Sequence, residues 1–320
     1  MLAATAVRAA PGNPLAALSV GEHPDPEVPA GWLRVRVKAA SINRHDLWTL
    51  EGVGAKRYPI VLGCDAAGLT DDGREVVVHG VIGDESAGGG DETLDPGRSL
   101  LSEVYDGTFA DWVAVPARNV IGKPAELSWE QAGCLSTAWL TAYRMVFARA
   151  NLPANGRLLV QGAGGGVATA AIQLAAAAGH TVYVTSRSEE RLARAVALGA
   201  TAGVVSGGRL PDRVDAVIET VGAATWEHSL KSLVPGGTIV VSGATSGPNP
   251  PADLARVFFR QLRIVGSTMG SREEYAGLLR FLVETGVRPV VDSVLPLRDA
   301  AAGLERVWAG EVFGKVVLVP

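Results

Sequence analysis

The segment from Arg157 to Arg187 constrains the fold of this chain more than any other. An apolar run ending at Gln161 leads into a glycine-rich turn, an alanine-rich stretch then ends at Gly179, and β-forming residues follow over Thr181–Thr185. This succession predicts a strand, a tight turn, a helix and a second strand, which together make a βαβ unit. Glycines allow the sharp turn, and they let a diphosphate reach the amides at the helix N-terminus.

The turn fits the dinucleotide fingerprint G-x-G-x-x-G/A only in part. The best register begins at Ala163, continues at Gly165 and ends at Ala168, so the first position is alanine where glycine is expected. The flanking strands and helix favour dinucleotide binding, and the alternative is an ordinary tight turn in an α/β core. We expect the diphosphate to contact the residues of the turn, which are Ala163, Gly164, Gly165, Gly166 and Val167.

The end of the second strand bears on the choice of cofactor. An acidic residue there would bind the ribose 2′-hydroxyl of NAD. Here the strand is followed by Ser186, Arg187 and Ser188, and the next acidic residue is Glu189. Ser186 can donate to a 2′-phosphate and Arg187 can pair with it, with help from Arg191. The sequence therefore favours NADPH over NADH. The same residues would also suit a solvated helix start with Ser188 as its N-cap.

Composition limits the class of protein. The chain has 320 residues, 48% of them hydrophobic and 19% charged, which predicts a folded protein of more than one domain. A net charge of -4 and the lack of a Lys/Arg-rich run argue against nucleic acid as a partner. The two cysteines, Cys64 and Cys134, cannot build a disulfide framework. The chain begins without the pattern of a signal peptide and its longest apolar stretch is too short to span a membrane, so we expect a cytoplasmic enzyme.

The pattern of strands and helices divides the chain. Residues up to about Pro124 are β-rich, a helix is expected from Ser128 to about Ala148, and strands then alternate with helices. Such alternation predicts an α/β fold with a doubly wound parallel sheet, the Rossmann arrangement. The last fifty residues or so return to strands. We therefore predict a discontinuous β-rich domain over 1-124 and 270-320, and a cofactor-binding domain over 125-269.

Ligands of such sheets sit at the carboxyl ends of the strands. Small residues at these ends suit a close approach of the backbone to a cofactor, although ordinary turns use the same residues. The residues at these ends that we expect to contact the cofactor are Val221, Gly243, Ala244, Thr245, Ser267 and Thr268.

Several further motifs are similar to those of a known family. They are Ala40–Asp46, Leu62–Gly68, Asp106–Asp111, Leu140–Arg144, Gly243–Gly247, Phe258–Arg260, Gly266–Gly270 and Phe313–Lys315. With the glycine turn, they make the chain resemble the medium-chain dehydrogenase/reductase superfamily, and within it the quinone oxidoreductase-like branch. The resemblance implies a GroES-like catalytic domain, a Rossmann domain with the cofactor in the cleft, and a homodimer formed through edge strands of the Rossmann sheet.

Zinc is the main question that the resemblance raises. Alcohol-oxidising members bind catalytic zinc through Cys, His and Cys, and the matching positions here hold Asn43, Cys64 and Thr137. Only Cys64 is a good ligand, with Asp65 as a possible second, because zinc prefers Cys, His and carboxylate. No cysteine lies in the loop that holds structural zinc in relatives. We therefore predict no metal, although His45 leaves an irregular site open, and Cys64 is more simply a small buried hydrophobe.

Without a Lewis acid, the chemistry that remains is hydride delivery to an electron-poor carbon of a quinone or an α,β-unsaturated carbonyl. By resemblance, Asn43 would bind the substrate oxygen or the cofactor ribose, Thr141 would contact the nicotinamide, and Lys315 would contact the cofactor. The substrate pocket would comprise Trp48, Cys64 and Thr137. His45 and Asp46 are candidates for a proton relay.

Three other functions stay open. One is a dedicated biosynthetic enoyl or ketone reductase of the same fold, which sequence cannot separate from a general reductase. The second is a zinc alcohol dehydrogenase. The third is an NADPH-binding sensor without catalytic activity.

Overall fold

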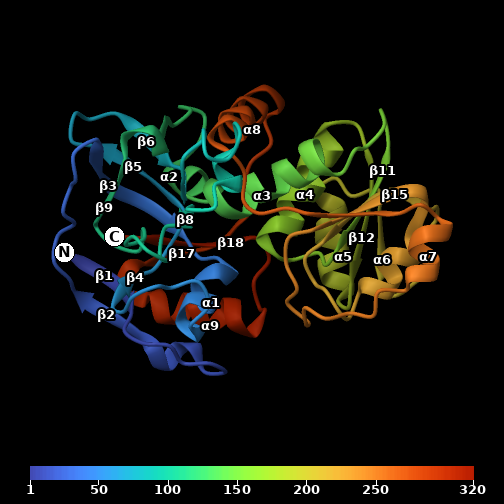
Figure 1. Ribbon diagram of the computed structural model, residues 1–320, viewed down its shortest axis with the longest axis horizontal. Coiled ribbons are helices and arrows are strands. Elements are labelled where there is room, and N and C mark those ends of the chain that lie inside the picture. Colours follow the sequence, from blue (N-terminus) through green and yellow to red (C-terminus); the bar gives the residue numbers. More distant parts are fainter. The chain divides into compact units, whose positions relative to one another are not determined.

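The computed structural model describes all residues from Met1 to Pro320, and the chain divides into two compact units. The first unit contains Met1–Leu140 and Met269–Pro320, and the second contains Thr141–Thr268 (Figure 1). One unit is β-rich and the other has a parallel sheet with helices, so the predicted α/β class is confirmed. The observed division falls later than the predicted boundary at residue 124, because helix α2 packs on strands of the first unit.

The first unit is built mostly from antiparallel strands. Its largest sheet has the order β10-β6-β5-β3-β18-β17, and β9 also pairs with β3. The strands of this sheet are β3 (Trp32–Ser41), β5 (Ala66–Thr70), β6 (Glu75–Val78), β9 (Trp112–Pro116), β10 (Val120–Gly122), β17 (Val291–Pro296) and β18 (Lys315–Val319). The smaller sheets contain β1 (Leu2–Ala6), β2 (Leu18–Glu22) and β4 (Ile60–Val61), and β7 (Val81–Ile82) with β8 (Ser99–Leu100). A buried apolar core that includes Leu47, Leu62 and Phe109 lies beneath these sheets.

Four α-helices accompany the strands of the first unit. They are α1 (Arg44–Glu51), α2 (Trp129–Ala132), α8 (Arg272–Thr285) and α9 (Ala300–Ala309). The long helix predicted from Ser128 is not continuous. After α2 the chain forms π-helical turns over Leu135–Trp139 and Arg144–Arg149, separated by α3 (Leu140–Tyr143). Each π turn holds an extra residue in the helix, an arrangement that often marks functional sites.

Helices α1 and α8 were not predicted, although both carry a sequence signal for a helix start. The Asn43 side chain and Asp46 form a capping box at the start of α1, and Ser271 and Glu274 do the same for α8. Such a box satisfies amides that the first helical turn leaves without partners. Both helix starts lie in sequence that is otherwise rich in β-forming residues, which is why the two helices were not predicted.

The second unit contains a six-stranded parallel sheet with the order β13-β12-β11-β14-β15-β16. Its strands are β11 (Arg157–Gln161), β12 (Thr181–Ser186), β13 (Ala202–Val205), β14 (Val214–Glu219), β15 (Leu233–Val241) and β16 (Arg263–Gly266). Its helices are α4 (Gly166–Ala177), α5 (Glu189–Ala197), α6 (Trp226–Ser232) and α7 (Leu254–Phe259). The strand order reverses between β11 and β14, which is where a doubly wound sheet binds its ligand.

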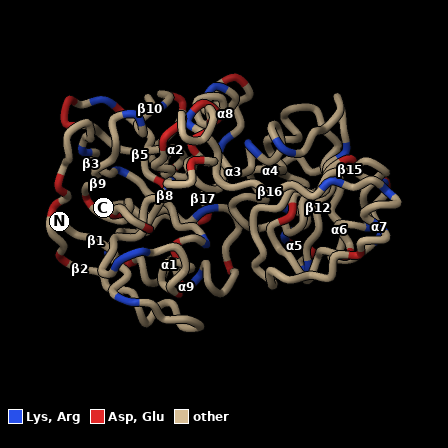
Figure 2. Tube along the Cα trace, viewed as in Figure 1, with Lys and Arg blue, Asp and Glu red and all other residues tan.

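Charged residues occur in both units of the chain. Acidic and basic residues are interspersed along the trace of both units (Figure 2). No helix of the structure combines the length and the apolar character that crossing a membrane would require.

Candidate functional site

The register of two strands brings Lys315 to Asn43. Strand β18 runs antiparallel to β3, with Val317 opposite Ser41 and the Ile42 amide donating to the Val316 carbonyl at 2.9 Å. Lys315 begins β18 and therefore lies opposite the residue that follows Ile42. Its ammonium donates to the Ile42 carbonyl at 2.8 Å and also to Asn43 Oδ1.

Asp65 is the anion of this cluster and is fully buried. Its Oδ2 accepts from Ser41 Oγ at 2.6 Å and from Asn43 Nδ2 at 2.9 Å, and it lies 3.4 Å from the Lys315 ammonium. Its Oδ1 accepts from the Thr137 amide at 2.6 Å. The lone pairs of the carboxylate are thus occupied, as a buried charge requires.

Asn43 is held by both ends of its amide. One Nδ2 hydrogen goes to the Ser41 carbonyl at 3.2 Å and the other to Asp65, while Oδ1 accepts from Lys315. An amide has only two such hydrogens. Asn43 can therefore offer a substrate or a ribose only its remaining Oδ1 lone pair, and its assignment as a ligand-binding residue stays a prediction.

The Asp46 side chain binds two backbone amides. Its carboxylate accepts from the Asn43 amide at 2.7 Å and from the Gly63 amide at 3.0 Å. Burial raises the pKa of Asp46 to about 7, against the opposing effect of these amides and of Lys315. The side chain is fully buried, so a proton on it has no direct path to solvent.

His45 precedes Asp46 on the first turn of α1 and is half-buried. Its Nε2 atom is buried without a hydrogen-bond partner. Burial lowers the pKa of His45, although Glu103, the Leu101 carbonyl and Asp65 act in the opposite direction. The ring is therefore neutral near pH 7. Its one N–H faces the Leu101 carbonyl, so the free Nε2 can only accept a hydrogen bond.

Cys64 and Thr137 differ in whether the side chain has a hydrogen-bond partner. Cys64 is fully buried, its thiol donates to the Leu101 carbonyl at 2.9 Å, and burial raises the pKa of this thiol well above its usual value. Such a thiol is an unreactive small hydrophobe. Thr137 uses its amide for Asp65, but its Oγ1 is buried without a partner. The Trp48 side chain, by contrast, is 36% exposed.

The donor set does not fit zinc. No group of three or more His, Cys, Asp or Glu side chains is placed to hold a metal ion. Of the three positions that the resemblance matches to zinc ligands, Cys64 alone offers a suitable atom. Asp65 already faces the Lys315 ammonium. We therefore derive no step through zinc, and the metal-free prediction stays a prediction.

The glycine turn of the second unit provides a cradle for an anion. Gly162 has φ +84°, a conformation that L side chains rarely adopt. Gly165 is the N-cap of α4, no side chain caps this helix, and a Cβ added at Gly165 would meet only open space. The first amides of α4 are therefore free to bind a diphosphate at the positive end of the helix dipole.

The end of β12 offers a serine and a free arginine. Ser186 Oγ accepts from the Ser188 amide at 3.1 Å, which leaves its own hydrogen available to donate. The Arg187 side chain is exposed and makes no ion pair or hydrogen bond within the chain. Ser188 caps α5 by accepting from the Arg191 amide, so the solvated helix start also holds. The two side chains fit a 2′-phosphate.

The remaining cofactor candidates lie near strand ends of the second unit. Val221 donates its amide to Glu219 Oε1 at 2.8 Å and accepts from the Ser246 amide at 2.7 Å, so only its side chain is left for a ligand. Ser267 Oγ is buried without a partner. The others are Thr141 at the start of the unit, Gly243, Ala244 and Thr245 after β15, and Thr268 at the end. Their contacts with a cofactor stay predictions.

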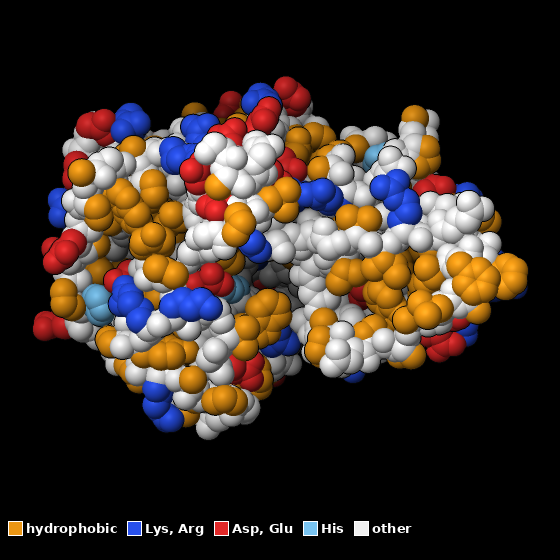
Figure 3. All heavy atoms as spheres, in the orientation of Figure 1, with side chains coloured by type: hydrophobic (Ala, Val, Ile, Leu, Met, Phe, Trp, Pro, Cys, Tyr) orange, Lys and Arg blue, Asp and Glu red, His pale blue; other side chains and the backbone are white.

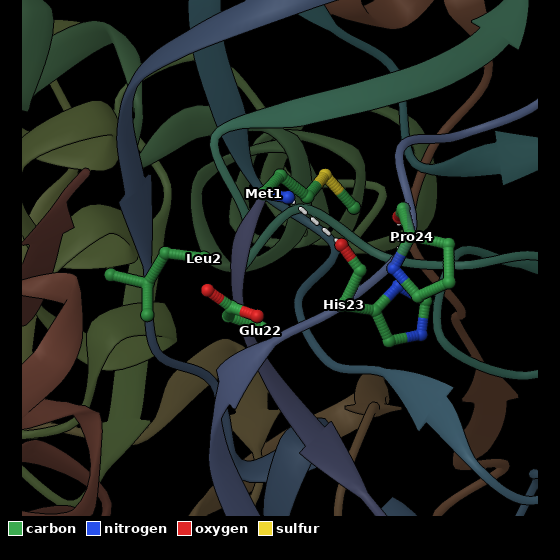
Figure 4. A pocket seen from close by; sticks show the side chains of 5 residues that line it. All are labelled: Met1, Leu2, Glu22, His23 and Pro24. Atoms are coloured by element: carbon green, nitrogen blue, oxygen red, sulfur yellow. Dashed lines mark hydrogen bonds between the residues drawn. The ribbon is translucent and has the colours of Figure 1, made fainter.

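One surface hollow of the first unit does not belong to this site. It has a volume of about 800 Å³ and is lined by Met1, Leu2, Glu22, His23 and Pro24. Figure 4 shows the Met1 amino group directed at the His23 carbonyl, to which it donates at 2.8 Å. None of the predicted site residues lines the hollow, so we assign it no role.

Comparison with known proteins supplies the family. A model described as the GroES-like domain of alcohol dehydrogenases matches residues 29–125, and a model described as zinc-binding dehydrogenase matches residues 166–284. An acryloyl-coenzyme A reductase of Metallosphaera sedula is 30% identical, over 93% of this chain and 95% of its own length. The chain belongs to the medium-chain dehydrogenase/reductase superfamily. Within that superfamily, the β-rich unit corresponds to the GroES-like domain and the parallel sheet to the Rossmann domain.

Solved structures of this superfamily are similar over the whole chain. One described as an NAD-dependent alcohol dehydrogenase has a TM-score of 0.92 and 36% identity, and the match covers 100% of both chains. Another is the 2-octenoyl-CoA carboxylase reductase CinF in complex with NADP and 2-octenoyl-CoA. Its TM-score is 0.90 at 26% identity, covering 99% of this chain and 87% of the other.

Sequence reasoning missed two features of the site. It gave Lys315 to the cofactor from a family motif, whereas the structure also places its ammonium on Asn43 and Asp65. It did not single out Gln161 or Glu219, two buried polar residues at the ends of β11 and β14. A polar residue that closes an otherwise apolar strand was the available signal.

Proposed function

We propose that this protein is an NADPH-dependent reductase of α,β-unsaturated carbonyl compounds or quinones that works without a catalytic metal. The observation that carries the proposal is the cluster of Lys315, Asn43 and Asp65. A lysine ammonium faces Asp65 in a cluster that has no adequate set of zinc ligands. Oxidation of an alcohol in this family uses zinc as the Lewis acid that activates the hydroxyl at neutral pH. Reduction of a conjugated double bond does not need a Lewis acid.

The second unit supports NADPH as the cofactor. The open N-terminus of α4 would hold the diphosphate, and Ser186 with Arg187 would hold the 2′-phosphate. CinF, a structural relative, was solved with NADP. When bound, the cofactor supplies the hydride, so the chain has to supply position and a proton source.

In the first unit, two polar groups remain free for the substrate. Thr137 Oγ1 and His45 Nε2 are buried and unpartnered, and the Thr137 hydroxyl can donate a hydrogen bond. We infer that this hydroxyl binds the carbonyl oxygen, on which negative charge develops when hydride reaches the β-carbon. Because burial lowers the pKa of His45, the ring is not an acid near pH 7, so water would deliver the final proton.

Among electron-poor substrates, enoyl thioesters have support from relatives. The M. sedula relative is named as an acryloyl-coenzyme A reductase, and CinF was solved with 2-octenoyl-CoA. A conjugated thioester has the same acceptor carbon as an enone. We therefore place enoyl thioesters beside enones and quinones in the proposed substrate class, which keeps a dedicated biosynthetic reductase within the proposal.

Alcohol oxidation is the second candidate, because the solved relative at 36% identity is described as an NAD-dependent alcohol dehydrogenase. The unsuitable zinc ligands argue against it. A single experiment separates the two: oxidation of NADPH against an enone, quinone and enoyl-CoA panel, with alcohol oxidation and bound zinc measured on the same preparation. Reduction without zinc supports the proposal, and alcohol oxidation with stoichiometric zinc contradicts it.

A homodimer through the second unit is the proposed assembly. Helix α7 and the edge strand β16 expose apolar side chains, among them Leu254 at 70%, Phe258 at 63%, Phe259 at 79% and Ile264 at 47%. Figure 3 shows hydrophobic side chains gathered over α7. Strand β16 pairs only with β15, so its outer edge has unpaired backbone groups. An exposed apolar patch beside an open edge is typical of an interface.

A further inference from the structure

A chain of buried hydrogen bonds joins three strand ends of the second unit. Thr185 at the end of β12 accepts from the Gly162 amide at 3.4 Å and donates to Gln161 Oε1 at 2.5 Å. Gln161, the last residue of β11, donates from Nε2 to Ser229 Oγ at 2.9 Å. Ser229 in turn donates to Glu219 Oε2, at the end of β14, at 2.6 Å. Each side chain donates a hydrogen bond to the next, and this series of hydrogen bonds ends on the carboxylate of Glu219.

The direction of this chain is fixed by its chemistry. A separation of 2.5 Å between Thr185 Oγ1 and Gln161 suits an O–H···O bond and is too short for an N–H donor. Oε1 of Gln161 therefore faces Thr185, and both hydrogens of Nε2 face the other way. They go to Ser229 Oγ and to His228 Nδ1, the latter at 2.9 Å. Hydrogen bonds that share one direction strengthen each other.

Both ends of the chain reach turns at the ligand-binding edge of the sheet. At one end Thr185 holds Gly162, the first residue of the glycine turn. At the other end Glu219 accepts from the amides of Val221 and Gly222 and from Thr225 Oγ1, at 2.8, 3.0 and 2.9 Å. Glu219, Thr185 and Ser229 are fully buried, and Gln161 is 1% exposed. None of these four side chains is exposed to contact a ligand. A substitution among them can therefore change ligand binding only by shifting the turns that they hold.

We propose that Gln161 is a positioning residue for cofactor binding, which couples the glycine turn at Gly162 to the turn after Glu219. This inference rests on the proposed binding of NADPH to the second unit. Among side chains the coupling has one route, because Thr185 and Ser229 have no direct bond and meet only at the Gln161 amide. Loss of either arm removes one of the groups that orient the amide, which the remaining arm and His228 Nδ1 then hold less firmly, so the remaining arm is weakened as well.

A double-mutant cycle tests the coupling. The variants are Thr185→Val, Ser229→Ala and the pair together, with the dissociation constant of NADPH measured by calorimetry and the melting temperature measured without cofactor. Each single variant should raise the dissociation constant about 3- to 10-fold, the effect of one hydrogen bond. The double variant should exceed the larger single effect by no more than about 2-fold, because both changes break one unit. In steady-state assays, the KM for NADPH should rise while kcat and the KM for the acceptor stay unchanged.

Two matched variants serve as controls. Thr185→Ser keeps the hydroxyl and should restore affinity to within about 2-fold of the unaltered protein. Ser232→Ala removes a hydroxyl from the same helix, but that hydroxyl donates to the His228 carbonyl at 2.7 Å and stands outside the chain. It should leave NADPH affinity unchanged.

The outcomes separate this inference from the proposed function. If the effects of Thr185→Val and Ser229→Ala multiply, or if Ser232→Ala weakens binding as much as Ser229→Ala, the coupling role of Gln161 is wrong while NADPH binding stands. If the unaltered protein does not bind NADPH, the proposed function fails and the inference fails with it.

Discussion

The ammonium of Lys315 lies 3.4 Å from the carboxylate of Asp65, and both side chains are buried. Removing one member of such a pair leaves a charge without compensation in the interior, which typically costs about 3–5 kcal/mol. Lys315→Met should therefore lower the free energy of unfolding by about that amount in urea titrations. The double variant Lys315→Met with Asp65→Asn should recover part of the loss.

The matched control for Lys315 is Lys231, whose ammonium pairs with Glu227 on the surface of α6. Exposed pairs contribute little, so Lys231→Met should change the free energy of unfolding by less than about 1 kcal/mol. Equal urea midpoints for Lys315→Met and the unaltered protein would show that the buried pair is not a structural charge pair.

A second prediction concerns His79 and acid stability. Its Nε2 contacts the Gly270 carbonyl at 2.9 Å, and burial lowers the pKa of the ring below its usual 6.5. The unfolded state thus binds a proton at higher pH than the folded state, so stability falls as pH drops below about 6.5, by up to about 1.4 kcal/mol per pH unit. The stability difference between the unaltered protein and His79→Gln should shrink, and can reverse, from pH 7 to pH 5.

Asp46 does not obscure the His79 comparison. Its raised pKa, about 7, produces a slope of the opposite sign, since its folded form holds a proton that the unfolded form releases. Both proteins carry Asp46, so its contribution cancels in the difference between them. Parallel curves of stability against pH for the two proteins would contradict the prediction for His79.

The third prediction concerns the choice of cofactor. The exposed Arg187 has no partner in the chain, and a charged hydrogen bond to a 2′-phosphate is worth about 1.5–3 kcal/mol. Arg187→Ala should weaken NADPH binding at least about 10-fold and leave NADH binding unchanged, as measured by calorimetry. Arg194→Ala is the control, because Arg194 lies on α5 and pairs with Glu190 at 3.9 Å. A similar loss for both cofactors would remove the assignment of Arg187 to the phosphate.

The proposed dimer gives the fourth prediction. Replacing Phe258 and Phe259 together by Asp should convert the protein to a monomer in light scattering, because charge in the exposed apolar patch disfavours its burial. Val53→Asp places the same charge at a 60% exposed valine of the first unit and should leave the assembly unchanged. A monomeric unaltered protein would contradict the proposed assembly.

Local patterns were enough to predict the Rossmann sheet. The glycine turn after β11 and the β-formers of β12 have the patterns that their structures require, and the parallel arrangement of the sheet follows from the alternation of strands and helices. The capping boxes at Asn43 and Ser271 were equally local and marked the two helices that went unpredicted. The interruption after α2 was not encoded in any pattern of this kind, since π turns depend on packing.

The polar cluster of the site could not be predicted from the sequence. Lys315 and Asn43 are 272 positions apart, and only the pairing of β18 with β3 brings them together. The motifs named both residues as ligands of the cofactor or substrate, but a motif does not show which groups of a side chain are already engaged. The same limit applies to Gln161, whose partners come from a neighbouring strand and from helix α6.

The most direct test of the proposed function is the rate of NADPH oxidation with an enone, a quinone and a short enoyl-CoA, together with the zinc content of the same sample. We predict turnover of at least one acceptor, a preference for NADPH over NADH, and less than about 0.1 zinc per chain, given the poor ligand set at Asn43, Cys64 and Thr137. Stoichiometric zinc with oxidation of alcohols, and no reduction of any acceptor, would contradict the proposal.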